Sequence, residues 1–61
     1  MNLITLTIGP MVTIHLMPDH INEYMPHWKG GSAIFTQFDE RPFIVEEPFD
    51  AVTSKILEVA P

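Results

Sequence analysis

The sequence predicts an α+β fold, in which a small bent antiparallel sheet or SH3-like half-barrel of about four or five strands is closed by one C-terminal helix. Before residue 48, segments of alternating apolar and polar residues recur between glycines and prolines, which is typical of half-buried strands. After residue 48 the apolar spacing becomes helical. A chain of 61 residues has room for one hydrophobic core, so we expect a single domain over residues 1–61.

The N-terminal part of the chain predicts a hairpin. Strands are expected over residues 3–8 and 11–16, with Gly9-Pro10 ending the first of them. Because side chains alternate across a strand, one face of each strand is assigned to the core. The residues assigned to that face are Ile4, Leu6, Ile8, Val12, Ile14 and Leu16.

The segment 18–28 permits two interpretations. Apolar and aromatic residues at positions 21, 24 and 25 fit one helical turn, whereas residues 24–28 fit an edge strand with Pro26 on its unpaired side. The paired glycines of residues 29–32 then predict a tight turn, because glycine adopts the positive φ that such turns need.

The second half of the chain predicts two more strands, over residues 33–38 and 43–46, and a helix over residues 48–59. The first of these strands carries apolar residues on both faces, so we expect it to be central. Residues 39–42 are expected to form the turn between the strands. Pro48 suits the first helical position. Ile34, Thr36 and Phe38 share one face of the central strand, and the expected buried stripe of the helix is Phe49, Val52, Ile56 and Val59.

Charge and composition narrow the classes of partner. The formal net charge is −5, and the basic residues are Lys29, Arg41 and Lys55. We expect no nucleic-acid ligand, because each neutralised phosphate needs a basic group. No run approaches the roughly 20 apolar residues that a membrane span needs. The first eight residues lack the basic flank of a signal peptide, so a cytoplasmic location is expected.

A contact surface for another protein is expected at residues 24–28. This segment combines aromatic residues and methionine around a proline, and tryptophan, tyrosine and methionine are common in interfaces. The alternative is that Trp28 caps a core that is short of large side chains. The expected partner-binding residues are Tyr24, Met25, His27 and Trp28.

A second contact is expected at the edge of the first strand. Small domains often gain stability by self-association, and this chain combines 46% hydrophobic residues with no cysteine. Residues 3–8 carry no charge and no proline to protect a strand edge. Pairing of this edge predicts a homo-oligomer, with Leu3, Thr5 and Thr7 at the contact.

Catalytic and metal sites are not expected. His15, His20 and His27 invite a metal interpretation, with Asp19 and Glu23 as further donors, but no pair of histidines has the spacing of one helix face. The acids at residues 39–40 suit a turn, and those at 46–50 suit a helix N-terminus. We therefore assign no catalytic, cofactor-binding or metal residue and expect no cofactor.

One family resemblance follows from the second half of the chain. Residues 34–56 contain an apolar strand, a polar turn, a second strand ending in Val45 and Glu47, and a helix. This order resembles the small flagellar proteins of the FlbD type, at residue level over residues 43–57. The resemblance implies their fold outline and a role in flagellar regulation.

The chain departs from that family in its turns. The departures are Pro26-His27-Trp28, Asp39-Glu40-Arg41 in place of a glycine turn, and Pro48 at the helix start. Short acidic chains of this build also resemble phage-encoded proteins that dock on a host protein or sequester a small molecule. We therefore expect a non-enzymatic protein-binding or regulatory module that self-associates. The alternative is an oligomer that sequesters a nucleotide or metabolite.

Overall fold

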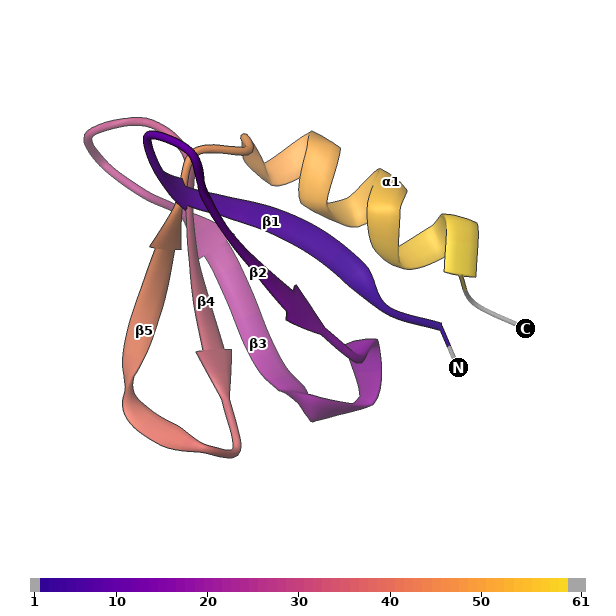
Figure 1. The fold of residues 1–61 in the computed structure, drawn as a ribbon. Helices are drawn as coiled ribbons and strands as arrows, with labels where there is room; N and C mark the ends of the chain where they lie inside the picture. The colour runs from indigo at the N-terminus through magenta and orange to yellow at the C-terminus, as the bar shows by residue number, and fades with distance from the viewer. Residues whose placement is uncertain (1, 60–61) are drawn as a thin grey trace.

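The computed structural model describes residues 2–59, which form two antiparallel sheets and one α-helix (Figure 1). A two-stranded sheet pairs β1 with β2, and a three-stranded sheet has the order β3-β4-β5. The α+β class with a C-terminal helix is confirmed, and the strands divide between two sheets. The elements are β1 (Ile4–Gly9), β2 (Val12–Leu16), the 3-10 turn η1 (Pro18–His20), β3 (Ile21–Pro26), β4 (Ser32–Thr36), β5 (Asp39–Val45) and α1 (Phe49–Val59).

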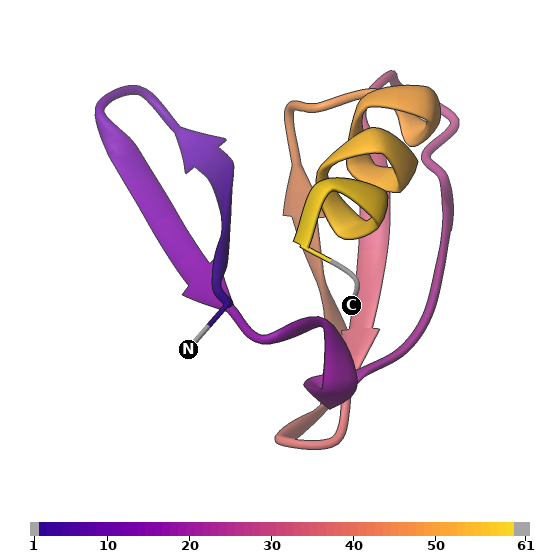
Figure 2. The ribbon, with the colours of Figure 1, turned by 90° about the vertical axis from the view of Figure 1, so that its right-hand side faces the viewer.

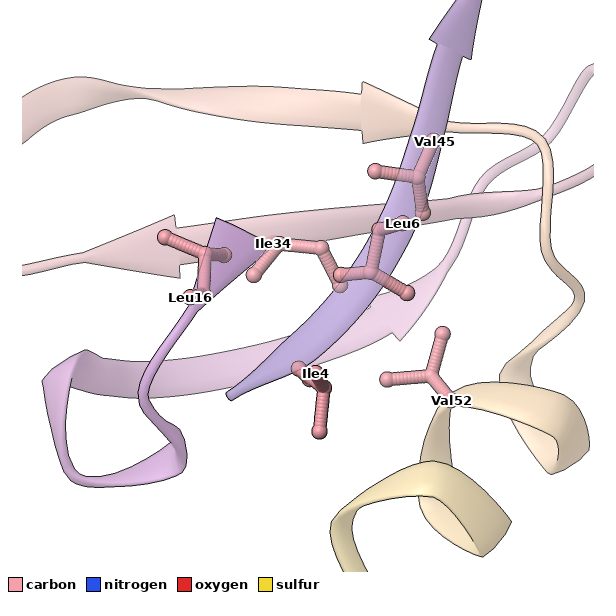
Figure 3. Packing of buried hydrophobic residues seen from close by; sticks show 6 residues of the cluster. All are labelled: Ile4, Leu6, Leu16, Ile34, Val45 and Val52. Atoms are coloured by element: carbon pink, nitrogen blue, oxygen red, sulfur yellow. The ribbon is translucent and has the colours of Figure 1, made fainter. Parts of the chain in front are cut away.

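The hydrophobic core lies where the two sheets and the helix meet. Figure 2 shows the β1–β2 hairpin leaning away from the three-stranded sheet, with β2 on the outer side. Leu6 from β1 and Ile34 from β4 are fully buried and lie near each other at the centre of the cluster (Figure 3). The buried cluster is Ile4, Leu6, Leu16, Ile34, Val45 and Val52. Every element except η1 and the edge strand β3 contributes to it.

The first hairpin follows the predicted alternation over most of its length. Ile4, Leu6 and Leu16 are buried, as predicted. Ile8 and Val12 were also assigned to the core, and that assignment is wrong, because their side chains are 38% and 48% exposed. The pairing register shifts between Thr7 and Gly9, so a bulge at Ile8 interrupts the alternation near the hairpin tip.

Of the two interpretations of residues 18–28, the edge strand is confirmed, but it spans Ile21–Pro26 and not residues 24–28. Strand β3 pairs along β4, and a single 3-10 turn, η1, precedes it. The N–H group of His27 donates to the carbonyl of Gly31 over 3.0 Å, so the backbone of His27 faces β4. By alternation the backbone of Pro26 faces outward, where its missing N–H costs no ladder bond.

Strand β4 is the central strand of its sheet, as predicted, but the turn that follows it is shorter than predicted. Thr36 pairs with Asp39, so residues 37–38 form the turn, and residues 39–42 belong to β5. The hydroxyl of Thr36 accepts a hydrogen bond from the N–H of Phe38 over 3.3 Å, which stabilises this tight turn. Phe38 lies in this turn and is 63% exposed, so the predicted extension of the strand to residue 38 is wrong.

Helix α1 covers the core with three of the four residues of the predicted stripe, and it begins one residue later than predicted. The carbonyl of Pro48 accepts the N–H of Val52 over 3.0 Å, so Pro48 directly precedes the first helical residue. Val52 is fully buried, and Ile56 and Val59 pack against the cluster. Phe49 was also assigned to the buried stripe, and that assignment is wrong, because its side chain is 37% exposed. Its ring stacks on Tyr24 with centroids 5.0 Å apart.

Truncation of the central core residue should show how much the fold depends on this cluster. Leu6→Ala removes a side chain with no exposed surface and should lower the free energy of unfolding by about 2–5 kcal/mol. Leu57→Ala is the matched control, because Leu57 is 68% exposed and its loss should cost no more than about 0.5 kcal/mol. Urea denaturation monitored by circular dichroism measures both. Equal costs in the two variants would contradict this packing.

Candidate interaction surface

The segment that follows β5 joins the two sheets. The N–H of Glu46 donates to the carbonyl of Thr7 over 2.7 Å. In return, the N–H of Thr7 donates to the two carboxylate oxygens of Glu47 over 2.8 and 3.1 Å, and the hydroxyl of Thr7 donates over 2.9 Å. The backbone and the side chain of Thr7 are thus hydrogen-bonded to Glu46 and Glu47. We call this contact the junction.

The first turn of the three-stranded sheet packs against the same segment. The hydroxyl of Ser32, which is fully buried, donates to the carbonyl of Glu47 over 2.8 Å. Gly31 has φ +77°, and a Cβ at this position would collide with the carbonyl oxygen of Val45. The glycine pair was predicted from turn geometry. The structure adds a second requirement for Gly31, which is the close passage of the chain after Val45.

The acids at residues 46–47 were attributed to the helix dipole, and the structure shows a different role for Glu47. Partial burial raises the pKa of its carboxyl, but the hydrogen bonds from the backbone and side chain of Thr7 lower it, and the net pKa lies below the ordinary value. The positive charge of Lys55 contributes in the same direction. Glu47 is therefore held in its charged form by the strand to which it binds.

The junction borders an open groove of about 430 Å³. Ile8 at the end of β1 and Ile44 in β5 supply its apolar walls, and each is partly exposed. His27, Lys29 and the two glycines of the β3–β4 turn line it on another side, and Val45 and Glu46 complete the lining. A groove with two exposed aliphatic side chains, one cation and one carboxylate suits an apolar side chain with polar neighbours on another molecule.

Beside this groove, Trp28 projects from the β3–β4 turn and is 83% exposed. The ammonium group of Lys29 lies 4.7 Å from the centroid of the indole ring, which is a cation–π contact. The turn is held by hydrogen bonds between His27 and Gly31 and between Gly30 and His27. The interpretation of Trp28 as a core cap does not fit this exposure.

The other two residues of the predicted contact segment do not join Trp28 on one face. Tyr24 is half-buried, and its hydroxyl shares a hydrogen bond of 2.8 Å with the hydroxyl of Thr53 in α1. Met25 is exposed and, as the next residue in the strand, points to the opposite face. Tyr24 therefore anchors the helix to β3, while His27 and Trp28 lie at the groove.

The tip of the first hairpin adds a further exposed apolar residue at this end of the molecule. Met11 is fully exposed and has φ +59°, a left-handed conformation that is unfavourable for a side chain of this kind. The tip and the β3–β4 turn both lie at the upper end of the molecule in Figures 1 and 2, and Figure 2 shows them on opposite sides of that end. We call the exposed residues at this end, together with the half-buried His27, the loop-end surface, namely Ile8, Met11, Val12, His27, Trp28, Lys29 and Ile44.

Sequence reasoning missed Ile8, Met11, Val12 and Ile44 as surface residues. Alternation assigned Ile8 and Val12 to the core. The bulge in β1 removes Ile8 from it, and Val12 lies at the tip end of β2, where exposure on the core face rises from Leu16 through Ile14 to Val12. Met11 was placed inside a strand, although its position directly after Gly9-Pro10 was the available signal for a turn. Nothing local distinguishes Ile44, which alternates with the buried Val45 in an edge strand.

The predicted oligomer edge is partly occupied within the chain. Leu3 and Thr5 are exposed. The N–H and carbonyl of Thr7 are both bound at the junction, so they are not free to pair with another strand. Of the edge Leu3, Thr5 and Thr7, the first two residues remain accessible.

The histidines lie in three different places. His15 shares a hydrogen bond of 3.0 Å with Thr5, His20 contacts the ring of Phe38 edge to face, and His27 lies beside Trp28. Within residues 2–59, no group of three or more histidine or acidic side chains is placed to hold a metal ion. A second open groove, of about 390 Å³, lies near the β4–β5 turn and is bordered by Glu23, Asp39 and Glu40.

Comparison with known proteins gives no relative from which function could be transferred. No family model, no curated protein and no solved structure matches the chain. In the part of the chain that the structure describes, the helix is too short and too polar to span a bilayer.

Acid should weaken the junction. Because the folded pKa of Glu47 lies below its ordinary value of 4.5, its contribution to stability is present above about pH 4.5 and is lost as pH falls through the folded pKa. Glu47→Gln should lower the free energy of unfolding at neutral pH by about 1–2 kcal/mol, since an amide accepts more weakly than a carboxylate. It should also lose less stability than the wild type on acidification, as measured by urea denaturation from about pH 7 to about pH 3.

The matched control is Glu46→Gln, which removes the same charge from the preceding residue, whose side chain is exposed. This variant should keep the acid dependence of the wild type. Identical pH profiles for Glu47→Gln and the wild type would contradict the role of the carboxylate in the junction.

The hairpin tip should tolerate glycine better than methionine. Met11→Gly relieves the left-handed strain at φ +59° and should raise the free energy of unfolding by up to about 1 kcal/mol. Val12→Gly is the control, because Val12 lies in β2, where glycine weakens a strand. Thermal unfolding compares the two, and a lower melting temperature for Met11→Gly would show that the tip adopts another conformation.

Proposed function

We propose that this protein is a non-enzymatic module that binds another protein through the loop-end surface and that it self-associates. The observation that carries the proposal is the exposure of Trp28 on a turn held by hydrogen bonds. Tryptophan contributes more than most residues to binding energy at interfaces. A side chain that is already positioned loses little further entropy on binding.

The surroundings of Trp28 favour a protein partner. The exposed aliphatic residues Ile8 and Ile44 line a groove next to the turn, so a partner that covers the indole ring can also place an apolar side chain between them. Lys29 adds a cation at the rim, where charges set orientation more than affinity. The combination of aromatic anchor, apolar groove and charged rim is the usual composition of an interface.

Two of the eight acidic residues have contacts that support a structural role for them. Glu47 binds Thr7, and the carboxylate of Asp39 accepts the N–H of Arg41 over 2.9 Å. Each of these hydrogen bonds gives the acidic residue a role in stabilising the fold. The resemblance to small flagellar proteins supports regulation as the purpose of binding, and the resemblance to phage-encoded proteins supports docking on a host protein.

A second candidate function is the sequestration of a small molecule by an oligomer. The two grooves, of about 390 and 430 Å³, have volumes typical of ligand pockets. Both are open, so a second subunit would have to close them. Native mass spectrometry of the protein purified from its own cells favours this candidate if a nucleotide or metabolite remains bound to the oligomer.

Photo-crosslinking tests the protein-binding proposal directly. A benzophenone amino acid in place of Trp28 should give a discrete crosslinked protein in the cells that make this chain, and an excess of unlabelled wild type should compete it away. The same label in place of Leu57, an exposed residue of α1, should give no such product. Equal products from both positions, or none from position 28, would contradict the proposal.

Trp28 also provides a built-in reporter, because it is the sole tryptophan of the chain. Its fluorescence should shift to shorter wavelength when the crosslinked partner, once purified, is added to the wild-type protein. An unchanged emission at saturating partner would place the contact elsewhere.

A further inference from the structure

Of the four strands that border the two sheets, β3 and β5 have a protected outer edge, and β1 has one that is protected in part. In β1, the backbone groups of Thr7 are bound at the junction. The edge strand β3 carries Glu23 and the outward-facing Pro26. The edge strand β5 carries Pro42 and the charged residues 39–41. Charges, prolines and covering contacts are the devices that prevent edge-to-edge pairing.

Strand β2 has none of these protections. Its sequence from Val12 to Leu16 contains no proline and no acidic or basic residue other than His15. Within residues 2–59, β2 pairs with β1 alone, and Figure 2 shows it on the outer side of the hairpin. Thr13 and His15 are exposed, so the outer edge of β2 is open at these two positions.

The direction of the free backbone groups follows from the junction. Thr7 directs its N–H and carbonyl away from β2, so its pairing with Thr13 is of the type without hydrogen bonds. The backbone groups of Thr13 therefore also point outward, and alternation gives the same direction to His15, which pairs with Thr5. The hydrogen bond between the side chains of Thr5 and His15 agrees with this close pair type. The outer edge of β2 therefore presents two N–H donors and two carbonyl acceptors, from Thr13 and His15.

We infer that two copies of this chain pair antiparallel through the outer edges of β2 and form a continuous four-stranded sheet. This inference rests on the self-association in the proposed function and identifies its surface. An antiparallel strand edge is complementary to itself under two-fold symmetry, so a second copy satisfies the outward groups of Thr13 and His15. A two-stranded sheet is marginal by itself, whereas a four-stranded sheet gains ladder bonds and apolar contacts.

Charge and apolar surface on β2 also favour a second copy. Each chain carries a net charge of −5, yet this seam brings no carboxylate of β2 against another. Val12 is exposed and Ile14 is half-buried on the core face of the strand. Pairing places these side chains next to those of the second copy and covers part of their surface.

Charged substitutions on the two strands of the hairpin test the seam. Thr13→Lys places like charges across the two-fold pairing, whereas Thr5→Lys puts the same charge on an exposed position of β1. Sedimentation velocity over micromolar to millimolar concentration should show a dimer for the wild type. Thr13→Lys should raise the dimer dissociation constant by about tenfold or more, and Thr5→Lys by less than about threefold.

Circular dichroism of both lysine variants checks that each remains folded. A thiol crosslink tests the same seam without changing the charge of the protein. The chain has no cysteine, so Thr13→Cys introduces a single thiol at the seam, with Thr5→Cys as its control. A short bismaleimide should link the dimer of Thr13→Cys and leave Thr5→Cys largely unlinked.

The outcomes separate this inference from the proposed function. A wild type that stays monomeric overturns self-association together with the seam. A dimer that Thr5→Lys weakens and Thr13→Lys leaves intact overturns the seam alone. Crosslinking at Trp28 is independent of both results, because Trp28 lies in the β3–β4 turn and not in the hairpin.

Discussion

The pairing of Thr7 with Glu46 and Glu47 is the contact on which the rest of the structure depends. Within residues 2–59 no strand ladder joins the two sheets, so this junction supplies the directional contact between them. It places β1 beside the end of β5, where Leu6 and Val45 enter one core. A core of this size contributes little excess stability. The orientation of the hairpin therefore depends on hydrogen bonds as well as on apolar burial.

The same junction produces the loop-end surface. Because β1 is bound at Thr7, its next residue, Ile8, lies beyond the core and beside Ile44 at the groove. Gly31 lets the β3–β4 turn approach the carbonyl of Val45, and this approach completes the wall of the groove next to Trp28. Apolar residues that the core cannot cover are thus gathered at one end of the molecule. Binding to a partner is the simplest use of such a surface.

Local patterns in the sequence predicted the elements, and long-range contacts account for what they missed. Alternation and helical spacing were sufficient for the first hairpin, the central strand and the helix, since Ile4, Leu6 and Val52 are buried as expected. The bulge at Ile8 and the two-residue turn before Asp39 depend on pairing registers that a single sequence does not reveal. The bond from Thr7 to Glu47 spans 40 residues, so local chemistry attributed Glu47 to the helix instead. The sequence left two interpretations of Trp28, a contact residue or a core cap, and its exposure in the finished fold decides against the core cap.

Amide hydrogen exchange followed by NMR tests the central claim most directly. In β1 the N–H of Thr7 points away from its ladder partner, so a free hairpin would leave it exposed to solvent. The junction predicts strong protection of this amide at every protein concentration, because it donates to Glu47. Protection of the outward amides of Thr13 and His15 should rise with concentration as β2 pairs. Exchange of the Thr7 amide as fast as that of the exposed turn at Lys29 would contradict the account.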